Sequence, residues 1–193
     1  QDDPGNVLTE RDSRDGERVV VPRDKWWFLS GTTGVEGADY ISKEGGFRAG
    51  KIYEIVYRSQ DPRVVGMGFA AVRDFMTYAK YEPSSPFKVK QGIAFGVSQT
   101  GRFLRHFLYE GFNKNERERQ VFDGMFIHTA GAGRGSFNHR FAQPSRDGHR
   151  FSTFNFPTDM FPFTGAPQTD PEIGVTAGLL PKSYLPKIFY TNS

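Results

Sequence analysis

The sequence contains no cysteine, so disulfide bonds and thiolate metal sites are excluded. It also has no apolar run of the roughly 18 residues that a membrane-spanning helix requires, and we expect no membrane span. An excess of one charge sign is missing as well, because the formal net charge is only +3 and both signs occur throughout the chain. This balance does not favour binding to nucleic acid or to an anionic membrane. The four histidines lack metal-ligand spacing, and we expect neither a metal nor a cofactor.

The residues that are present predict a globular protein with a substantial core. Of the 193 residues, 37% are hydrophobic and 24% are charged, which is enough for one packed domain. Aromatic residues make up 15%, including 19 phenylalanines, and many of them lie in the last third. Residues 136–182 are rich in Pro, Phe and Gly and show no regular periodicity. A segment of this length favours a functional cap or insertion over a simple connection.

Residues 92–101 predict a strand, a sharp turn and the start of a helix around Ser98. Residues 93–95 form a short apolar run between glycines, which is typical of a strand buried in a parallel sheet. After the serine, apolar residues recur at helical spacing, with Arg105 off their stripe, and Gly111 stands where a glycine commonly ends a helix. The stripe consists of Phe103, Leu104, Phe107 and Leu108. A serine on such a turn is exposed at the sheet edge, where its hydroxyl can attack a carbonyl group.

A tight strand-to-helix turn crowds its own backbone, so small residues are expected two positions before and after the serine. Gly96 meets the first requirement, whereas Thr100 occupies the second position and Gly101 follows one residue late. The N–H of Gln99, at the start of the helix, is the expected oxyanion donor. The alternative interpretation is that Ser98 lies in an ordinary turn or caps the helix.

Strands and helices alternate along the chain, which predicts an α/β fold. We expect strands at residues 19–21, 26–29, 51–58, 93–95, 121–130 and 187–190, and helices beginning near residues 66 and 99. This order implies a mostly parallel sheet with helices on both faces. The first 18 residues are expected to follow the surface without regular structure, and residues 30–50 to form a loop. The chain then divides into an N-terminal extension, residues 1–46, and a core, residues 47–193.

Several segments together resemble the alpha/beta hydrolase domain proteins, many of which are predicted to be exported. These segments are residues 50–54, 66–74, 96–105, 121–124 and 136–141. The resemblance implies that residues 47–193 form an incomplete α/β-hydrolase core with Ser98 as nucleophile, in a periplasmic or secreted protein. The G-x-S-x-x-G pattern is also similar, more distantly, to that of glucuronoyl esterases. Neither resemblance supplies a substrate.

A serine nucleophile requires a general base and a carboxylate that orients this base. In the α/β-hydrolase fold these groups follow in the order serine, acid, histidine. The acid commonly follows the second strand after the nucleophile, which here is the strand expected at residues 187–190. On this interpretation the acid and the histidine lie beyond Ser193, and the chain is an internal fragment that is inactive alone.

The histidines within the chain are the alternative source of a base. His106 lies on the same helix as the serine, roughly 12 Å further along its axis, too far to serve. His128 falls inside an apolar strand, where a buried hydrogen-bonded residue is expected. His139 and His149 belong to the long insertion and could reach the site. His139, between an asparagine and an arginine, is also a candidate contact for a substrate carboxylate or sugar hydroxyl.

The function that these patterns favour is hydrolysis of a carboxylic ester, on a small molecule or linked to a carbohydrate. The aromatic segment at residues 151–163 would then roof an apolar or sugar-stacking pocket. An acyltransferase would use the same nucleophile, and a catalytically silent hydrolase-fold module would bind a ligand or partner without chemistry. A carbohydrate-binding protein would instead be built mainly from antiparallel strands. The glycine-rich residues 131–135 lack the helix and lysine of a phosphate-binding loop and predict a tight loop. The sequence does not predict the oligomeric state.

Overall fold

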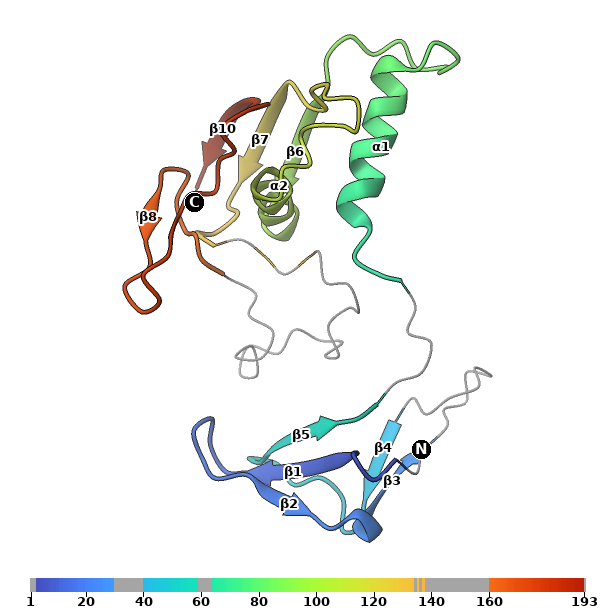
Figure 1. Cartoon of the computed structure of the whole chain (residues 1–193), viewed down its shortest axis with the longest axis vertical. Helices are drawn as coiled ribbons and strands as arrows, with labels where there is room; N and C mark the ends of the chain where they lie inside the picture. The colour runs from blue at the N-terminus through green and yellow to red at the C-terminus, as the bar shows by residue number, and fades with distance from the viewer. Residues whose placement is uncertain are drawn as a thin grey trace. The chain divides into compact units, whose positions relative to one another are not determined.

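The structure, a computed structural model, describes residues 3–29, 40–58, 64–133, 135, 137 and 160–192. It contains two compact units, Gln1–Pro62 and Arg63–Ser193. In Figure 1 the colour follows the residue number, so the first unit is drawn in blue to cyan and the second in green to red. This division falls later than the predicted boundary between residues 46 and 47. The strand expected at residues 51–58 therefore belongs to the N-terminal unit and not to the core.

The N-terminal unit contains a three-stranded antiparallel sheet. Its central strand is β1 (Val7–Arg11), which pairs with β2 (Val19–Val21) on one side and β5 (Ile52–Val56) on the other. The strands predicted at the positions of β2 and β5 are confirmed. The expectation that β5 joins the parallel sheet is wrong, because all of its recorded pairing is antiparallel to β1.

Strand β1 also corrects the expectation that the first 18 residues follow the surface without regular structure. Its Leu8 is fully buried, and its Arg11 is only 4% exposed. Arg11 Nη2 lies 3.2 Å from Glu54 Oε1 on β5, so the charge is paired between neighbouring strands. Charged residues are rarely buried unless they are paired, and a sequence rich in them therefore resembles a surface segment.

A second, two-stranded antiparallel sheet completes this unit. It consists of β3 (Trp26–Leu29), which is preceded by a short 3-10 helix, Arg23–Lys25, and β4 (Tyr40–Lys43). The expected strand at residues 26–29 is confirmed, whereas β4 lies within the segment predicted to be a loop. The buried hydrophobic side chains among the described residues of this unit form one small cluster of Leu8, Val21 and Trp26.

The larger unit is built on a parallel sheet. Its elements are α1 (Gly68–Tyr81), β6 (Ile93–Val97), α2 (Gln99–Tyr109), β7 (Gly124–His128), β8 (Gln168–Thr169), β9 (Thr176–Ala177) and β10 (Lys187–Thr191). The sheet has the order β10-β7-β6, with both pairs parallel. The predicted α/β fold with a parallel sheet is confirmed. Among the described residues, neither α-helix combines the length and apolar character needed to cross a membrane.

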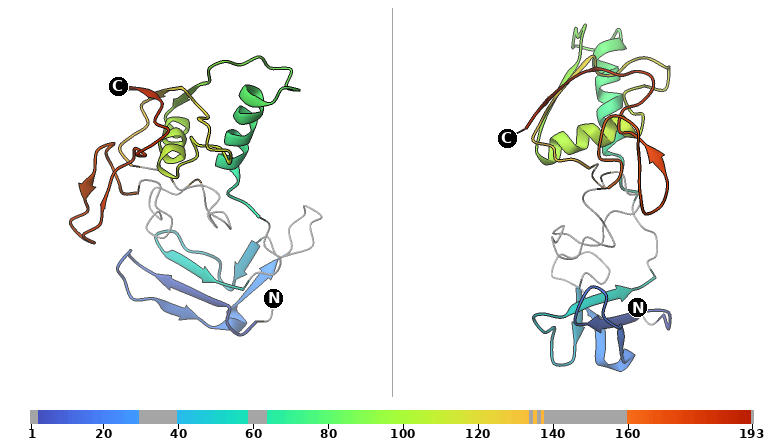
Figure 2. Two further views of the ribbon diagram at one scale, coloured as in Figure 1. Left: turned by 45° about the horizontal axis from the view of Figure 1, so that its top comes forward. Right: turned by 90° about the vertical axis from the view of Figure 1, so that its left-hand side faces the viewer.

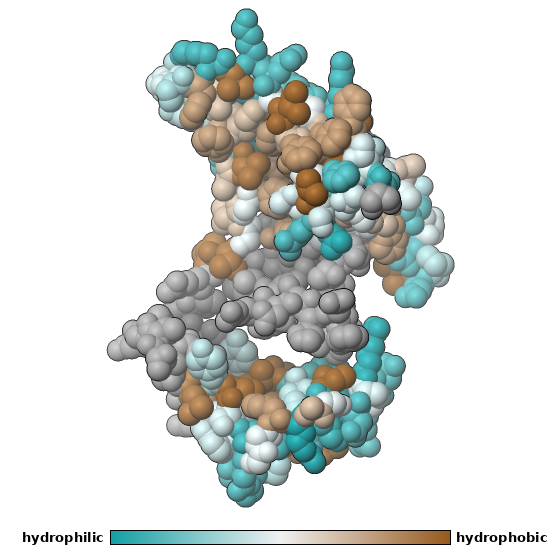
Figure 3. Space-filling model, turned by 180° about the vertical axis from the view of Figure 1, so that it is seen from behind, coloured by the Kyte–Doolittle hydropathy of each residue, from teal (hydrophilic) through white to brown (hydrophobic). Residues whose placement is uncertain are grey.

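Both helices contribute to one core on a single face of the parallel sheet (Figure 2). Side chains alternate across a strand, so every second residue faces the helices. The sheet residues in this core are Ala94, Met125 and Ile127, and the most buried helix residues are Phe69, Phe107 and Leu108. The alternate positions Ile93, Phe95 and Phe189 are 63–73% exposed. Figure 3 shows apolar residues gathered on this unit. Helices were predicted on both faces of the sheet, whereas the two α-helices in the described part of the chain both cover the same face.

A buried lysine fixes α1 to the N-terminal edge of the sheet. Lys80 Nζ donates to the carbonyl oxygens of Gln120 and Val121, at 3.1 and 3.0 Å, and to Asp123 Oδ2 at 2.8 Å. The same carboxylate oxygen accepts a hydrogen bond from Gly92 N–H at 2.8 Å. Since an ammonium group has three donors, these bonds satisfy it fully.

Candidate active site

Ser98 is the single residue between β6 and α2, at the C-terminal edge of the parallel sheet. Its backbone angles, φ 53° and ψ −115°, lie in a region that residues with a side chain rarely adopt. Ser98 is exposed, and within the described residues its hydroxyl makes no capping hydrogen bond to α2. The hydroxyl is therefore available for chemistry and is not used to cap the helix.

Two glycines allow β6 and α2 to approach each other closely at this turn. A Cβ atom on Gly96 would lie 2.6 Å from the carbonyl oxygen of Thr100 and 2.7 Å from the nitrogen of Gly101. A Cβ atom on Gly101 would lie 3.1 Å from Ala130 Cβ and 3.1 Å from the oxygen of Gly96. The late glycine of the motif thus stands where α2 passes the end of β6 and the residues that follow β7.

Thr100 fills the position where the commoner pattern has glycine, and its hydroxyl closes the turn. Thr100 Oγ1 accepts a hydrogen bond from Val97 N–H and donates one to Val97 O, both at 2.8 Å. The sequence pattern predicted only that this residue is small. The bracing role could not be derived from it, because a threonine hydroxyl in a turn has several backbone groups within reach.

The backbone around Ser98 is anchored to the neighbouring strand. Ser98 N–H donates to the carbonyl oxygen of His128, at the end of β7, over 2.9 Å. Gln99 is the first residue of α2, so its N–H has no acceptor inside the helix. It lies at the positive end of the helix dipole, where a developing negative charge is stabilised. Its role as oxyanion donor stays a prediction.

A hollow of about 480 Å³ opens at the same edge of the sheet, beside the ends of β7 and β10. Its walls include the apolar side chains of Ile127 and Phe163 and the ring of Tyr190. Ligands of parallel α/β sheets bind at this C-terminal edge. Phe163 belongs to the aromatic segment that was expected to roof a pocket, whereas residues 151–159 lie outside the described residues.

Arg105 lies off the apolar stripe of α2, as expected, but it is only 7% exposed and lines the hollow. Its guanidinium donates to the carbonyl oxygen of Gly131 and, at 3.2 Å, to that of Phe163. Gly131 has a φ of 73°, which suits the tight glycine loop predicted there. Burial raises the pKa of Tyr190, and the nearby charge of Arg105 offsets only part of that rise. Tyr190 therefore keeps its proton at neutral pH. The burial of Arg105 could not be predicted from the helical periodicity of α2, because the residue that helps to bury it, Phe163, lies far away in the sequence.

Comparison with known proteins decides the family. A family model described as an alpha/beta hydrolase domain matches residues 50–171, more than half of the chain. The chain belongs to this alpha/beta hydrolase domain family. No curated protein and no solved structure gives a significant match. The more distant likeness to glucuronoyl esterases therefore has no support from the comparisons.

Two histidines of this alpha/beta hydrolase are described, and both make contacts other than with the Ser98 hydroxyl. His106 Nε2 lies 3.0 Å from Glu110 Oε1, and its ring packs edge-on against Phe69 with centroids 4.9 Å apart. His128 is partly buried, and its Nδ1 lies 2.7 Å from Thr191 Oγ1. Within the described residues, no hydrogen bond joins either ring to Ser98.

The other sequence-predicted residues lie outside the described part of the chain. His139, the candidate substrate contact, and His149 both belong to the undescribed residues 138–159. Among the described residues, no group of three or more His, Asp or Glu side chains is placed to hold a metal ion.

Proposed function

We propose that this alpha/beta hydrolase cleaves carboxylic esters with Ser98 as its nucleophile. The observation that carries the proposal is the state of Ser98, which is exposed, strained and free of a capping bond at a tight strand-to-helix turn. Strained backbone persists where the surrounding structure enforces it, and such positions concentrate at functional sites. The crowded glycines and the Thr100 hydroxyl enforce the turn here.

In the proposed reaction, Ser98 Oγ attacks the ester carbonyl carbon while a general base removes its proton. The negative charge that forms on the carbonyl oxygen is held by the Gln99 N–H and the positive end of α2. The carbon–oxygen bond to the alcohol then breaks, and the alcohol leaves with the proton returned by the base. In the second half, the base takes a proton from water, whose oxygen attacks the acyl carbon. The bond from this carbon to Ser98 Oγ then breaks, the base returns the proton to Oγ, and the carboxylic acid leaves. Because neither described histidine ring is hydrogen-bonded to Ser98, we assign the base and its carboxylate to residues outside the described part of the chain.

We assign either the acyl part or the alcohol part of the ester substrate to the hollow at the ends of β7 and β10. Its apolar walls and the protonated Tyr190 hydroxyl suit a substrate with both apolar and hydrogen-bonding parts. A small-molecule ester and an ester linked to a carbohydrate both meet this description, and His139 remains the proposed contact for the latter.

The test is covalent labelling of the protein, expressed at its full natural length, with a fluorophosphonate. We expect one label on the unmodified protein, none on Ser98→Ala, and an unchanged label on Ser183→Ala, which alters an exposed serine elsewhere. Label that persists in Ser98→Ala would overturn the assignment of the nucleophile.

The absence of any label on the unmodified, folded protein would instead favour a catalytically silent binding module. The observation that keeps this second function in view is that neither imidazole ring among the described residues is hydrogen-bonded to Ser98. An acyltransferase would be labelled in the same way. It is distinguished by whether the acyl group passes to water or to an added alcohol.

A further inference from the structure

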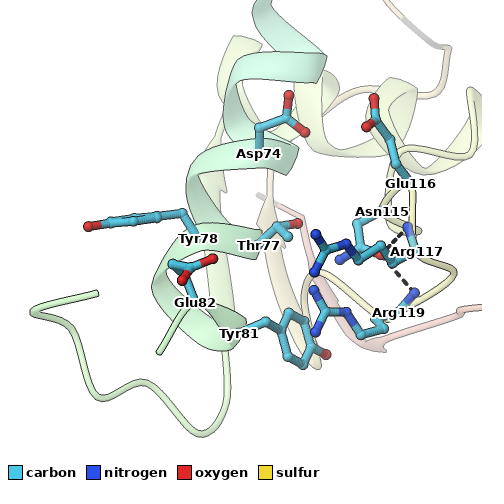
Figure 4. A pocket seen from close by; sticks show the side chains of 9 residues that line it. All are labelled: Asp74, Thr77, Tyr78, Tyr81, Glu82, Asn115, Glu116, Arg117 and Arg119. Atoms are coloured by element: carbon cyan, nitrogen blue, oxygen red, sulfur yellow. Dashed lines mark hydrogen bonds between the residues drawn. The ribbon is translucent and has the colours of Figure 1, made fainter. Parts of the chain in front are cut away.

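A second hollow, of about 250 Å³, lies between the C-terminal half of α1 and residues 113–120 (Figure 4). Residues 113–120 connect the end of α2 to the start of β7, and α1 ends shortly before β6 begins. The hollow therefore belongs to the N-terminal edge of the parallel sheet. Ser98 lies at the opposite, C-terminal edge, so the proposed esterase reaction does not use this place.

Asn115 is one of the residues that line the hollow, and its side chain is held in a fixed orientation. Its Oδ1 accepts hydrogen bonds from the backbone N–H groups of Arg117 and Arg119, at 3.0 and 2.9 Å. Its own N–H donates to the carbonyl oxygen of Arg119 at 2.9 Å. Since both acceptor contacts are made by Oδ1, the amide nitrogen Nδ2 is the other end of this side chain. Asn115 is only 4% exposed, yet its Nδ2 has no hydrogen-bond partner among the described residues.

Two further buried polar atoms that lack a partner within the described part of the chain belong to residues lining the same hollow. They are Thr77 Oγ1 on α1 and Arg119 Nε, and together with Asn115 Nδ2 they supply three hydrogen-bond donors. Arg119 is fixed by stacking, because its guanidinium carbon lies 4.1 Å from the centre of the Tyr81 ring. Figure 4 shows the guanidinium groups of Arg117 and Arg119 extending side by side toward α1.

The acidic residues around the hollow are engaged elsewhere. Asp74 and Glu116 both pair with Arg73, at 2.7 and 3.1 Å, and Glu82 accepts a hydrogen bond from Ser84 at 3.2 Å. Among the described residues, by contrast, neither Arg117 nor Arg119 takes part in an ion pair. The protein thus presents unused donors and positive charge, and a ligand must bring acceptor oxygens.

We propose that this hollow binds the carboxylate group of a small ligand. The two oxygens of a carboxylate accept from Asn115 Nδ2, Thr77 Oγ1 and Arg119 Nε together, with the charge of Arg117 beside them. A phosphate dianion offers the same kind of acceptor. It is disfavoured because three carboxylates, those of Asp74, Glu82 and Glu116, also line the hollow.

The test is a titration of the protein with acetate, and separately with inorganic phosphate, at fixed ionic strength. The readouts are the ¹H–¹⁵N signals of the Asn115 side-chain amide and the Arg119 Nε–H. We expect both signals to shift saturably with acetate and less readily with phosphate. The absence of a saturable shift would overturn the proposal, and tighter binding of phosphate would overturn the choice of a carboxylate.

Two variants and a control locate the binding. Asn115→Asp keeps the Oδ1 acceptor but replaces the donor by an anionic oxygen, and we expect acetate binding to weaken at least tenfold. Thr77→Val removes only the hydroxyl, so it tests the same site even if the first variant is unstable, with a loss of a few fold. Gln91→Glu adds an equal charge at an exposed position outside the hollow and should leave the affinity unchanged. Unaltered binding in Thr77→Val and Asn115→Asp would refute the site.

Discussion

The two three-stranded sheets among the described residues differ in the kind of side chain that fills their interiors. The parallel sheet β10-β7-β6 packs against an apolar core that includes Phe107 and Leu108, both fully buried. The antiparallel sheet β2-β1-β5 contributes Leu8 and Val21 to a buried apolar cluster that, among the described residues, has only one further member, Trp26 on β3. Beside this cluster it encloses Arg11, which pairs with Glu54, and Glu54 also accepts a 2.6 Å bond from Arg18. The periodic spacing of apolar residues predicts an apolar interior from the sequence, whereas no such pattern predicts an interior that is completed by ion pairs.

The chain offers a separate signal for each of these regions. Both of its tryptophans, Trp26 and Trp27, lie on β3 in the N-terminal unit. Both described α-helices lie in the larger unit. Tryptophan fluorescence therefore reports unfolding of the first unit, and helical circular dichroism reports unfolding of the second.

The largest effect is expected from Gly96→Ala at the turn that carries Ser98. The added Cβ would lie 2.6–2.7 Å from the backbone of Thr100 and Gly101, which cannot move without shifting α2. We expect a loss of about 4 kcal/mol or more in the larger unit, seen by circular dichroism, with unchanged tryptophan fluorescence. Gly124→Ala is the matched control, since its Cβ would make only ordinary contacts at 3.7 Å. Equal stability of the two variants would show that the turn is not as crowded as described.

The parallel half of the fold was predictable because its signals are local and agree with one another. The apolar run at β6, the stripe on α2 and Gly111, whose φ is 78°, all indicate the same strand-turn-helix. Strand β1 gave no such agreement, since Leu8 is its one fully buried apolar residue. At the candidate site, the place of Ser98 was predictable. Contacts that depend on distant segments were not predictable, as the hydrogen bond from Arg105 to the carbonyl oxygen of Phe163 illustrates.

An intermediate effect is expected from one substitution made in both interiors. Leu8 and Leu108 are each fully buried, one in the three-residue cluster and the other in the larger core. Leu108→Ala should cost about 4 kcal/mol, because surrounding helices and strands cannot close the cavity. Leu8→Ala should cost closer to about 2 kcal/mol, since a small cluster relaxes more easily. Denaturant unfolding with both signals checks this, and a larger loss for Leu8→Ala would reverse the comparison.

The smallest effect concerns Asp123, the charged link at the N-terminal edge of the parallel sheet. Burial raises the pKa of this carboxyl. The hydrogen bonds from Lys80 and Gly92 N–H and the charge of Lys80 lower it by more, so the pKa lies below its ordinary value. A folded-state pKa below that of the unfolded chain, about 3.9, means that the carboxylate stabilises the fold above this pH. This contribution is lost as the pH falls through the folded-state pKa.

Asp123→Asn should therefore be less stable than the unmodified protein at pH 7, and the difference should shrink toward pH 3. At low pH the unmodified carboxyl is itself neutral, so the two proteins then carry the same charge at this position. Unfolding followed by circular dichroism across this range measures the convergence, while tryptophan fluorescence should show no difference between the two. Asp74→Asn is the control, because that carboxylate pairs with Arg73 at an exposed position, where ion pairs contribute little. If the difference in free energy of unfolding between Asp123→Asn and the unmodified protein stays constant from pH 7 to pH 3, the charge of Asp123 does not stabilise the contact between α1 and the sheet.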